Sequence, residues 1–195
     1  GSASLIQTTK KKSTIPVIET GAGNCHLYVE KSGDIEVAKK ILINGKLQRP
    51  SVCNALESLL VDREIAEKAL PVLLSAMREN NVTVHGCPET AKIFPDVTPA
   101  TDEDYATEYH GYELSCKVVG STDEAIAHIN KYGTHHSDAI VTENNAAAEK
   151  FLREVDSAAV YVNASTRFTD GFEFGFGAEM GISTQKLHAR GPLGP

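Results

Sequence analysis

The chain has 195 residues, enough for one sizeable domain with its own hydrophobic core. Its hydrophobic fraction of 41% and charged fraction of 23% are typical of a globular protein. The net charge of −7 disfavours a nucleic-acid-binding protein, because such proteins usually present a basic surface. The one basic run, residues 10–12, is short and is expected at a helix end or in a loop. No apolar run reaches the roughly 18 residues of a membrane span, and no signal peptide is visible.

The four cysteines are widely spaced along the chain. They form no CxxC pair, and none is clustered with histidine at the spacing of zinc ligands. A chain of this size does not need disulfides for stability, so we expect reduced thiols in a cytoplasmic protein. His135 and His136 are adjacent and would face opposite ways in a strand, which disfavours a shared metal. We therefore expect no metal site.

Short apolar runs alternate with helical patterns from the start of the chain. Residues 15–19 and 25–30 are predicted strands, separated by the glycines of residues 21–23. Asp34 is expected to cap a helix over residues 35–47, whose apolar side chains recur on one face. A strand is expected next, over the apolar segment that begins at Ala55 and ends at Val61.

The middle of the chain continues the alternation. Asp62 is expected to cap a helix over residues 63–80, which Pro71 should kink or break into two pieces. A strand over residues 82–85 is followed by a Cys-Pro turn and then by an irregular acidic stretch at residues 96–109.

The second half supplies clearer signals. A strand is expected over residues 113–119, and the capping box at residues 121–124 opens a helix that Gly133 closes. The remaining predictions are a strand at 139–142, a helix at 144–155, a strand at 158–163 and an ordered loop from residue 164. This order predicts one α/β domain with a largely parallel sheet.

Cys53 is the strongest candidate for chemistry. It follows a Pro-Ser loop in residues 48–57 (QRPSVCNALE) and is flanked by small and polar residues, which favours exposure at the mouth of a strand. A thiol in such a place can act as a nucleophile if its surroundings lower its pKa. The alternative is a buried structural cysteine, which is the commoner fate of a free thiol.

Two glutamates are candidates for a polar site. Glu19 ends a predicted strand where the chain turns on glycines, and sites in open α/β sheets form at the carboxyl ends of strands. The glycines themselves are not a dinucleotide fingerprint, because neither the third glycine nor a helix follows. Glu108 could bind a ligand hydroxyl. Either residue could instead be a solvated surface carboxylate.

The tail holds a second group of candidates. Hydroxyls, an amide and a guanidinium converge in residues 163–168 (NASTRF), and Arg167 could bind a carboxylate or phosphate through two hydrogen bonds. The glycines of residues 174–179 (FGFGAE) would allow a close backbone approach to a ligand. Aromatic core packing and a tight turn explain the same segment equally well. Residues 188–192 (HARGP) add two further side chains that could contact an anion.

Taken together, these segments resemble the catalytic domain of the gamma-glutamyl phosphate reductase family, in the aldehyde dehydrogenase superfamily. The resemblance rests on residues 50–57 (PSVCNALE), 163–168, and 174–182 leading to 188–192, and it spans nearly the whole chain. The superfamily's general-base glutamate motif precedes the nucleophile by about the 34 residues that separate Glu19 from Cys53. Residues 108–111 (EYHG) look like its cofactor-ribose motif.

The resemblance implies NADPH-dependent reduction of L-glutamyl 5-phosphate to L-glutamate 5-semialdehyde in proline biosynthesis, through a thioester on Cys53. By the same resemblance, the Cys53 backbone N–H stabilises the oxyanion, with Asn54 beside the nucleophile. Glu19 would be a base or a structural residue, since a reductase gains nothing from activating water. The implied substrate-binding residues are Ser165, Thr166 and Arg167, and the implied cofactor-binding residues are Glu108 and His110, the latter standing where a Phe is usual.

The resemblance also implies an organisation and partners. Residues 1–195 are expected to fold as the thiol-bearing catalytic domain, a three-layer α/β unit, with the Rossmann-type cofactor domain outside this chain. Such a fragment should have little or no reductase activity alone. The full-length protein is expected to be a homo-oligomer, and a glutamate 5-kinase is among the partners that the resemblance implies.

Three other functions are compatible with the sequence. The same motifs occur in the reductase domain of a bifunctional pyrroline-5-carboxylate synthase, which a fused kinase domain would reveal. A cysteine hydrolase would need a histidine within hydrogen-bond reach of Cys53, and no spacing nominates one. A non-catalytic module would leave Cys53 inert and use the tail for assembly.

Overall fold

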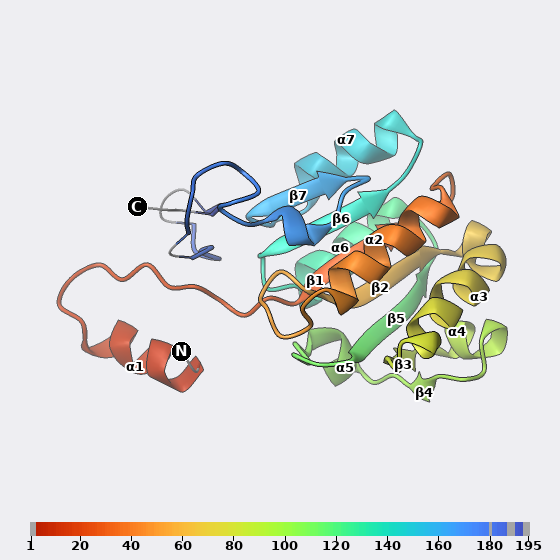
Figure 1. Ribbon diagram of the computed structural model, residues 1–195, viewed down its shortest axis with the longest axis horizontal. Helices are drawn as coiled ribbons and strands as arrows, with labels where there is room; N and C mark the ends of the chain where they lie inside the picture. Colours follow the sequence, from red (N-terminus) through yellow and green to blue (C-terminus); the bar gives the residue numbers. More distant parts are fainter. Residues whose placement is uncertain (1–2, 180, 187–189, 193–195) are drawn as a thin grey trace.

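A seven-stranded sheet forms the centre of the computed structural model, which describes residues 3–179, 181–186 and 190–192 (Figure 1). Every strand pair is parallel, and the strand order is β4-β3-β5-β2-β1-β6-β7. The strands are β1 (Cys25–Val29), β2 (Leu56–Asp62), β3 (Thr83–Gly86), β4 (Thr98–Pro99), β5 (Glu113–Val119), β6 (Ser137–Val141) and β7 (Ala159–Val162).

Helices cover both faces of this sheet (Figure 1). The helices are α1 (Ala3–Lys12), α2 (Ile35–Leu47), α3 (Arg63–Glu79), α4 (Pro88–Ile93), α5 (Asp102–Ala106), α6 (Thr122–Tyr132) and α7 (Asn145–Glu154), with a 3₁₀ turn, η1 (Thr166–Phe168). Neighbouring residues of a strand face opposite sides. Leu27 and Leu59 therefore join the core beneath α2 and α3, whereas Tyr28 and Leu60 join the core beneath α6 and α7. The predicted α/β class is confirmed.

Helix-capping residues explain why the starts of α2, α3 and α6 could be predicted from the sequence. Asp34 accepts a hydrogen bond from the Val37 N–H at the start of α2, and Asp62 accepts one from the Glu64 N–H at the start of α3. Ser121 caps α6 in the same way, and α6 ends before Gly133 as predicted. β5 has the predicted bounds.

Four details differ from the sequence-based expectations. Residues 15–19 form no strand; only an isolated antiparallel bridge between Thr20 and Ser183 occurs near them. The Cys-Pro turn instead opens α4, because the Cys87 thiol caps the Thr90 N–H and Pro88 fits the first helical position. The acidic stretch contains β4 and α5. Pro71 does not divide α3, which runs unbroken with Pro71 exposed.

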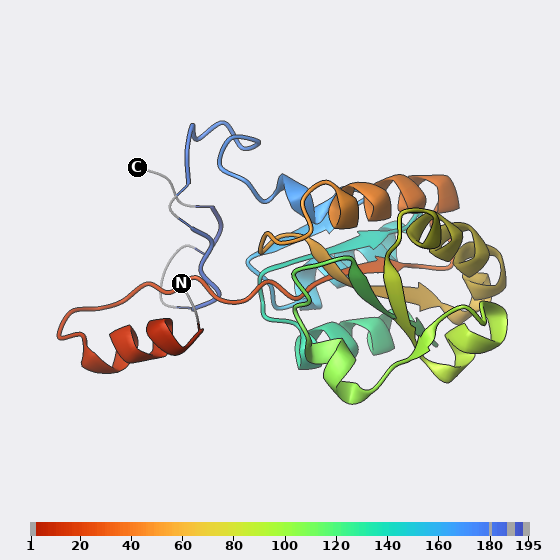
Figure 2. The same cartoon turned by 60° about the horizontal axis from the view of Figure 1, so that its bottom comes forward.

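Two segments extend away from the sheet on the side from which the strands start. α1 and the extended residues 13–24 form one of them, and the described part of the chain after Thr169 forms the other (Figures 1 and 2). The Thr20–Ser183 bridge joins the two segments. Ile15, Ile18, Phe172, Phe174 and Phe176 expose large apolar side chains there. Within the described residues, no helix is long and apolar enough to cross a membrane.

Candidate active site

The loops that precede four neighbouring strands meet at one edge of the sheet. Because the strands are parallel, their starts lie side by side. Residues 21–24 lead into β1, 48–55 into β2, 107–112 into β5 and 133–136 into β6. Cys53 therefore lies at the amino edge of the sheet. Sequence reasoning had instead favoured a site at the carboxyl ends of the strands, where it placed Glu19.

Cys53 sits half-buried in the turn before β2. The turn is closed by a hydrogen bond from the Ala55 N–H to the Val52 carbonyl (3.0 Å). Two residues at the start of β1 contact the Cys53 carbonyl oxygen. The Cys25 thiol donates to it at 3.3 Å, and the Gly23 backbone packs so closely that an added Cβ would lie 1.6 Å from it. The strand start therefore fixes the backbone of the candidate nucleophile.

This close approach predicts that Gly23→Ala displaces Cys53. A methyl group cannot share the space of the Cys53 carbonyl, so we expect a loss of about 1–3 kcal/mol in the free energy of unfolding, as for other overpacked sites. Urea denaturation measures the loss, and the rate of Cys53 alkylation by iodoacetamide should change with it. Gly111→Ala is the matched control, because its Cβ would lie 3.7 Å from the nearest atom, the Tyr109 carbonyl oxygen. Equal behaviour of the two variants would contradict the prediction.

The surroundings of Cys53 raise its pKa instead of lowering it. Burial is the largest cause, followed by the negative charges of Glu179 and Glu108. The backbone N–H of Cys53 itself and the Arg167 guanidinium act in the opposite direction. Two carboxylates and one guanidinium therefore surround the thiol closely enough to influence its charge.

Glu108 lies beside the nucleophile turn and is attached to it through Gly23. Its Oε1 accepts the Gly23 N–H at 2.8 Å, and its Oε2 lies 3.3 Å from His110 Nε2. The Glu108 side chain is 12% exposed, whereas the His110 ring is largely exposed. His110 has a left-handed backbone (φ 57°), unusual for a residue with a side chain. The structure therefore places both predicted cofactor-binding residues next to the Cys53 turn.

The predicted substrate-binding segment also reaches this turn. After β7 the chain turns back, and Thr166 donates its hydroxyl to the Asn54 carbonyl at 2.7 Å. Arg167 contacts the Asn54 Oδ1 through Nη1 and the Gln48 Oε1 through Nε (3.1 Å). Ser165 caps η1 by accepting the Arg167 N–H. The guanidinium is thus held at the same edge as Cys53.

The Asn54 side chain ties the nucleophile turn to this segment. It is 4% exposed, and its Nδ2 donates to the Thr169 carbonyl at 2.9 Å while its Oδ1 faces Arg167. Thr169 in turn shares hydroxyl hydrogen bonds with Ser137 and Tyr161 (both 2.8 Å). In this arrangement Asn54 holds Arg167 in place.

Glu19 has a different environment from the other candidates. Its carboxylate forms an ion pair with Lys10 of α1 (2.8 Å), and its N–H donates to the Gln185 side chain (3.0 Å). Its second carboxylate oxygen is buried without a hydrogen-bond partner among the described atoms. The structure therefore places Glu19 between the two extended segments, where it joins α1 to the C-terminal part of the chain.

The C-terminal segment brings one more charge to the site. Glu179 Oε2 accepts the Gly171 N–H (2.9 Å), which closes the loop of residues 170–179. The three phenylalanines of this loop are exposed, so the alternative of aromatic core packing is wrong. Arg190 binds Asp156 (3.1 Å) and the His135 carbonyl (3.0 Å) instead of facing Cys53. The neighbouring His188, also a predicted anion contact, lies outside the described residues.

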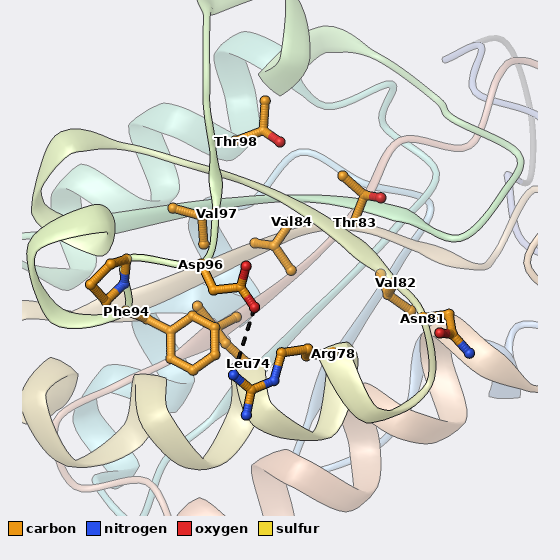
Figure 3. Close-up of a pocket in the computed structure, with 11 residues that line it drawn as sticks. Leu74, Arg78, Asn81, Val82, Thr83, Val84, Phe94, Asp96, Val97 and Thr98 are labelled. Atoms are coloured by element: carbon orange, nitrogen blue, oxygen red, sulfur yellow. Dashed lines mark ion pairs between the residues drawn. The ribbon is translucent and has the colours of Figure 1, made fainter.

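Pockets lie at several places in the described part of the chain, and Glu19 helps to line one of about 270 Å³ between α1 and residues 17–20. A small one of about 190 Å³ is lined by Arg167, Gln48, Phe168, Asn44 and Glu173, next to the Cys53 turn. A larger one of about 430 Å³ lies at the far edge of the sheet, between α3 and β3–β4 (Figure 3). There Arg78 pairs with Asp96 (3.6 Å) and stacks over Phe94, and none of the predicted site residues takes part. In the described part of the chain, no three His, Cys, Asp or Glu side chains are placed to hold a metal.

Sequence reasoning missed the roles of four residues at or near the site. Gly23 has no motif of its own, and its role emerges only when β1 and β2 pair. Glu179 is separated from Cys53 by more than a hundred residues. Lys46 and Glu57 form a buried ion pair, with 2.6 Å between Lys46 Nζ and Glu57 Oε2, and no sequence motif marked Lys46. Glu57 could have been noticed, because it is a charged residue within the otherwise largely apolar strand segment of residues 55–61.

The chain is similar to known proteins in sequence and in structure. No protein-family model matches it. A gamma-glutamyl phosphate reductase from Dictyoglomus thermophilum is 63% identical over 194 residues, covering 100% of this chain and 47% of the relative. The crystal structure of the gamma-glutamyl phosphate reductase from Thermotoga maritima matches with a TM-score of 0.97 and 55% identity, over 100% of this chain and 47% of that one.

A more distant structure shares only the fold. An acetylating aldehyde dehydrogenase from Geobacillus thermoglucosidasius matches at a TM-score of 0.67 and 20% identity, over 86% of this chain and 46% of that one. The chain spans about half the length of these gamma-glutamyl phosphate reductases. The chain has the α/β fold of aldehyde dehydrogenase-like structures, and over its whole length it is similar to about half of the gamma-glutamyl phosphate reductases that it matches.

Proposed function

We propose that this chain is the thiol-bearing catalytic part of a reductase that converts L-glutamyl 5-phosphate into L-glutamate 5-semialdehyde and phosphate, in proline biosynthesis. The observation that carries the proposal is the half-buried Cys53 at the amino edge of the sheet, with the Arg167 guanidinium held at the same edge by Asn54, the residue after Cys53. An electrophile with negative charge suits a thiol beside a fixed guanidinium. The identity to gamma-glutamyl phosphate reductases supports the substrate.

The first half of the reaction uses residues of this chain. The Cys53 thiolate attacks the acyl carbon, a sulfur–carbon bond forms, and the carbon–oxygen bond to phosphate breaks. Phosphate leaves with the bonding electron pair, and the acyl group remains on Cys53 as a thioester. Reduction of that carbonyl then breaks the sulfur–carbon bond and returns the thiolate. The Cys53 N–H, which already stabilises the thiolate, is the proposed donor to the oxyanion.

The residues near Cys53 fit a nicotinamide cofactor. Glu108 presents a carboxylate that is 12% exposed and has lone pairs to spare beyond its contacts with Gly23 and His110, as a ribose hydroxyl would require. Bound NADPH supplies the hydride for the thioester carbonyl. In the proposal, a Rossmann-type domain elsewhere in the protein binds the rest of the cofactor, which accords with a chain that spans about half of its relatives.

The remaining candidates receive supporting roles. Asn54 positions Arg167 and the nucleophile turn, Ser165 and Thr166 hold the substrate-binding segment against that turn, and Arg167 binds the substrate's carboxylate. Glu19 is structural, because its carboxylate is paired with Lys10. The four free thiols suit a cytoplasmic enzyme. We propose further that the full-length protein is a homo-oligomer. An associated glutamate 5-kinase would supply its unstable acyl phosphate substrate.

The proposal is tested by turnover in the full-length protein. L-Glutamyl 5-phosphate is generated in place by glutamate 5-kinase, glutamate and ATP, and the loss of NADPH absorbance is followed. We expect NADPH consumption that requires the kinase and the kinase's ATP, with no consumption by the 195-residue chain alone. Kinase-independent consumption, or turnover by the isolated chain, would contradict the proposal.

Arg167→Ala should impair substrate binding in the full-length protein. Removing a guanidinium that pairs with a carboxylate costs about 1.5–3 kcal/mol, so we expect KM for L-glutamyl 5-phosphate to rise about 10- to 100-fold. Arg167→Lys keeps the positive charge but not the paired hydrogen bonds. Its KM should lie between that of the unsubstituted protein and that of Arg167→Ala. The steady-state KM of the three proteins decides the matter, and an unchanged KM in Arg167→Ala removes the assignment.

A further inference from the structure

A buried ion pair lies behind the nucleophile turn, and the proposed reaction does not use it. Lys46, near the end of α2, donates to Glu57 Oε2 at 2.6 Å, and both side chains are at most 1% exposed. The helix approaches β2 closely enough for this contact because residue 45 is glycine; a Cβ there would lie 2.4 Å from the Leu56 side chain. Burying two charges is costly, and apolar residues of similar volume are often equally stable. The pair therefore calls for a role beyond stability.

The second oxygen of Glu57 points to that role. Glu57 Oε1 accepts the backbone N–H of His110 at 3.3 Å, the residue with the left-handed backbone. This hydrogen bond, donated by the His110 N–H to a buried carboxylate, helps to hold the unfavourable conformation. The loop of residues 108–110, where Glu108 resides, is thereby attached to the start of β2.

The chain of contacts continues to the thiol. Glu108 accepts the Gly23 N–H at 2.8 Å, and Gly23 packs directly against the Cys53 carbonyl. Glu108 is also one of the two carboxylates that raise the pKa of Cys53. A displacement of loop 108–110 would thus alter both the backbone support of Cys53 and the negative charge beside it.

We propose that Glu57, with Lys46 as its counter-ion, is a positioning residue that fixes loop 108–110 and, through Glu108 and Gly23, the placement and charge environment of Cys53. The inference rests on the proposed role of Cys53 as nucleophile. Lys46 orients the Glu57 carboxylate and favours its anionic form: burial, the largest cause, raises the pKa of Glu57 to about 7 even with Lys46 acting to lower it. Neither residue contacts the reacting thiol.

The test replaces both charges together, as Lys46→Met with Glu57→Leu, in the 195-residue chain. This double variant avoids an unpaired buried charge and removes the acceptor of the His110 N–H. Amide hydrogen exchange, resolved by NMR, reports the Gly23 and His110 N–H groups. We expect exchange at both to accelerate about 10-fold or more in the folded variant, since local opening becomes easier. Glu57→Gln, which retains one acceptor oxygen, should give a smaller effect and serves if the double variant does not fold.

A second readout follows the thiol itself. With Glu108 no longer held near Cys53, the pH profile of Cys53 alkylation by iodoacetamide should shift to lower pH, raising the rate at neutral pH about threefold. Glu30→Gln is the matched control. Glu30 is an equally buried carboxylate, 3% exposed, at the opposite edge of the sheet, where it binds Ser32 and Thr142. That variant should leave both readouts unchanged.

The outcomes separate this inference from the proposed function. Unchanged Gly23 exchange and an unchanged Cys53 profile in the folded double variant would overturn the positioning role, whatever reaction the protein catalyses. Neither readout involves acyl phosphate or NADPH, so failure of the turnover assay leaves them interpretable. In the full-length reductase, the double variant should lower kcat about 10-fold with KM for the acyl phosphate unchanged, because Arg167 is untouched. A change in KM alone would also contradict the inference.

Discussion

Cys53→Ser in the full-length protein is expected to lower kcat for L-glutamyl 5-phosphate reduction by at least about 1,000-fold. A serine hydroxyl is a poor nucleophile without an activating base, and removing a nucleophile costs several orders of magnitude in known enzymes. The substitution is nearly isosteric, so the turn that Gly23 and Cys25 support should persist. Steady-state kinetics together with a thermal melt distinguish lost chemistry from lost folding.

The control for this variant is another thiol of the same chain. Cys116 lies buried in β5, and burial raises its pKa to about 12, so it should be chemically inert. Cys116→Ala should reduce stability through a small cavity and leave turnover within about twofold. If Cys53→Ser retained a tenth or more of the activity, the thiol could not be the nucleophile.

The second large effect concerns stability in acid. His128 and His136 are at most 4% exposed, and burial lowers the pKa of His128 to about 3 and that of His136 to about 4. His26, Lys117 and Lys131 add to the shift at His128, whereas Asp138 opposes it at His136. Both rings are therefore neutral in the folded chain at any pH where the unfolded chain begins to protonate them.

The sign of the effect follows from proton uptake on unfolding. Between about pH 4 and 6.5 the unfolded state binds more protons than the folded state at these two positions. The free energy of unfolding should therefore fall as pH is lowered through this range, at up to about 2.7 kcal/mol per pH unit from the pair. Urea denaturation at several pH values measures the slope.

A single substitution checks the assignment to His128. Its ring packs edge-on against Tyr105 and His26, and its Nε2 is buried without a hydrogen-bond partner among the described atoms. His128→Phe keeps the ring and removes the titration, so the slope attributed to the pair should fall by about half. An unaltered slope would show that acid sensitivity arises elsewhere.

Much of the fold was predictable because its signals are local. Asp34, Asp62 and Ser121 each precede an apolar helical pattern, and their side chains cap the helices as expected. The prediction of a strand over residues 15–19 was wrong, because strand formation there would need a neighbouring strand, and the local sequence does not show whether one is present. Ile15 and Ile18 are 73% and 61% exposed, and no strand of the described sheet pairs with them.

The site was less predictable than the fold, because its geometry depends on strand pairing. Cys53, Glu108 and Arg167 could each be selected from their own segments, and the family resemblance then suggested a role for each. That Glu108 is attached to Cys53 through Gly23 follows only from the order β5-β2-β1, which brings three separate loops together. Glu19 had the expected spacing from Cys53, yet the structure pairs it with Lys10.

The most direct measurement for the central claim is peptide mass spectrometry of the 195-residue chain after exposure to L-glutamyl 5-phosphate generated in place. The account predicts one glutamyl group on the peptide that carries Cys53, removable by hydroxylamine as thioesters are. Its formation should quicken as pH rises, because the pKa of Cys53 is raised and only the thiolate reacts. A chain that stays unmodified, or carries the glutamyl group on Cys25, Cys87 or Cys116, would contradict the assignment of Cys53 as the nucleophile.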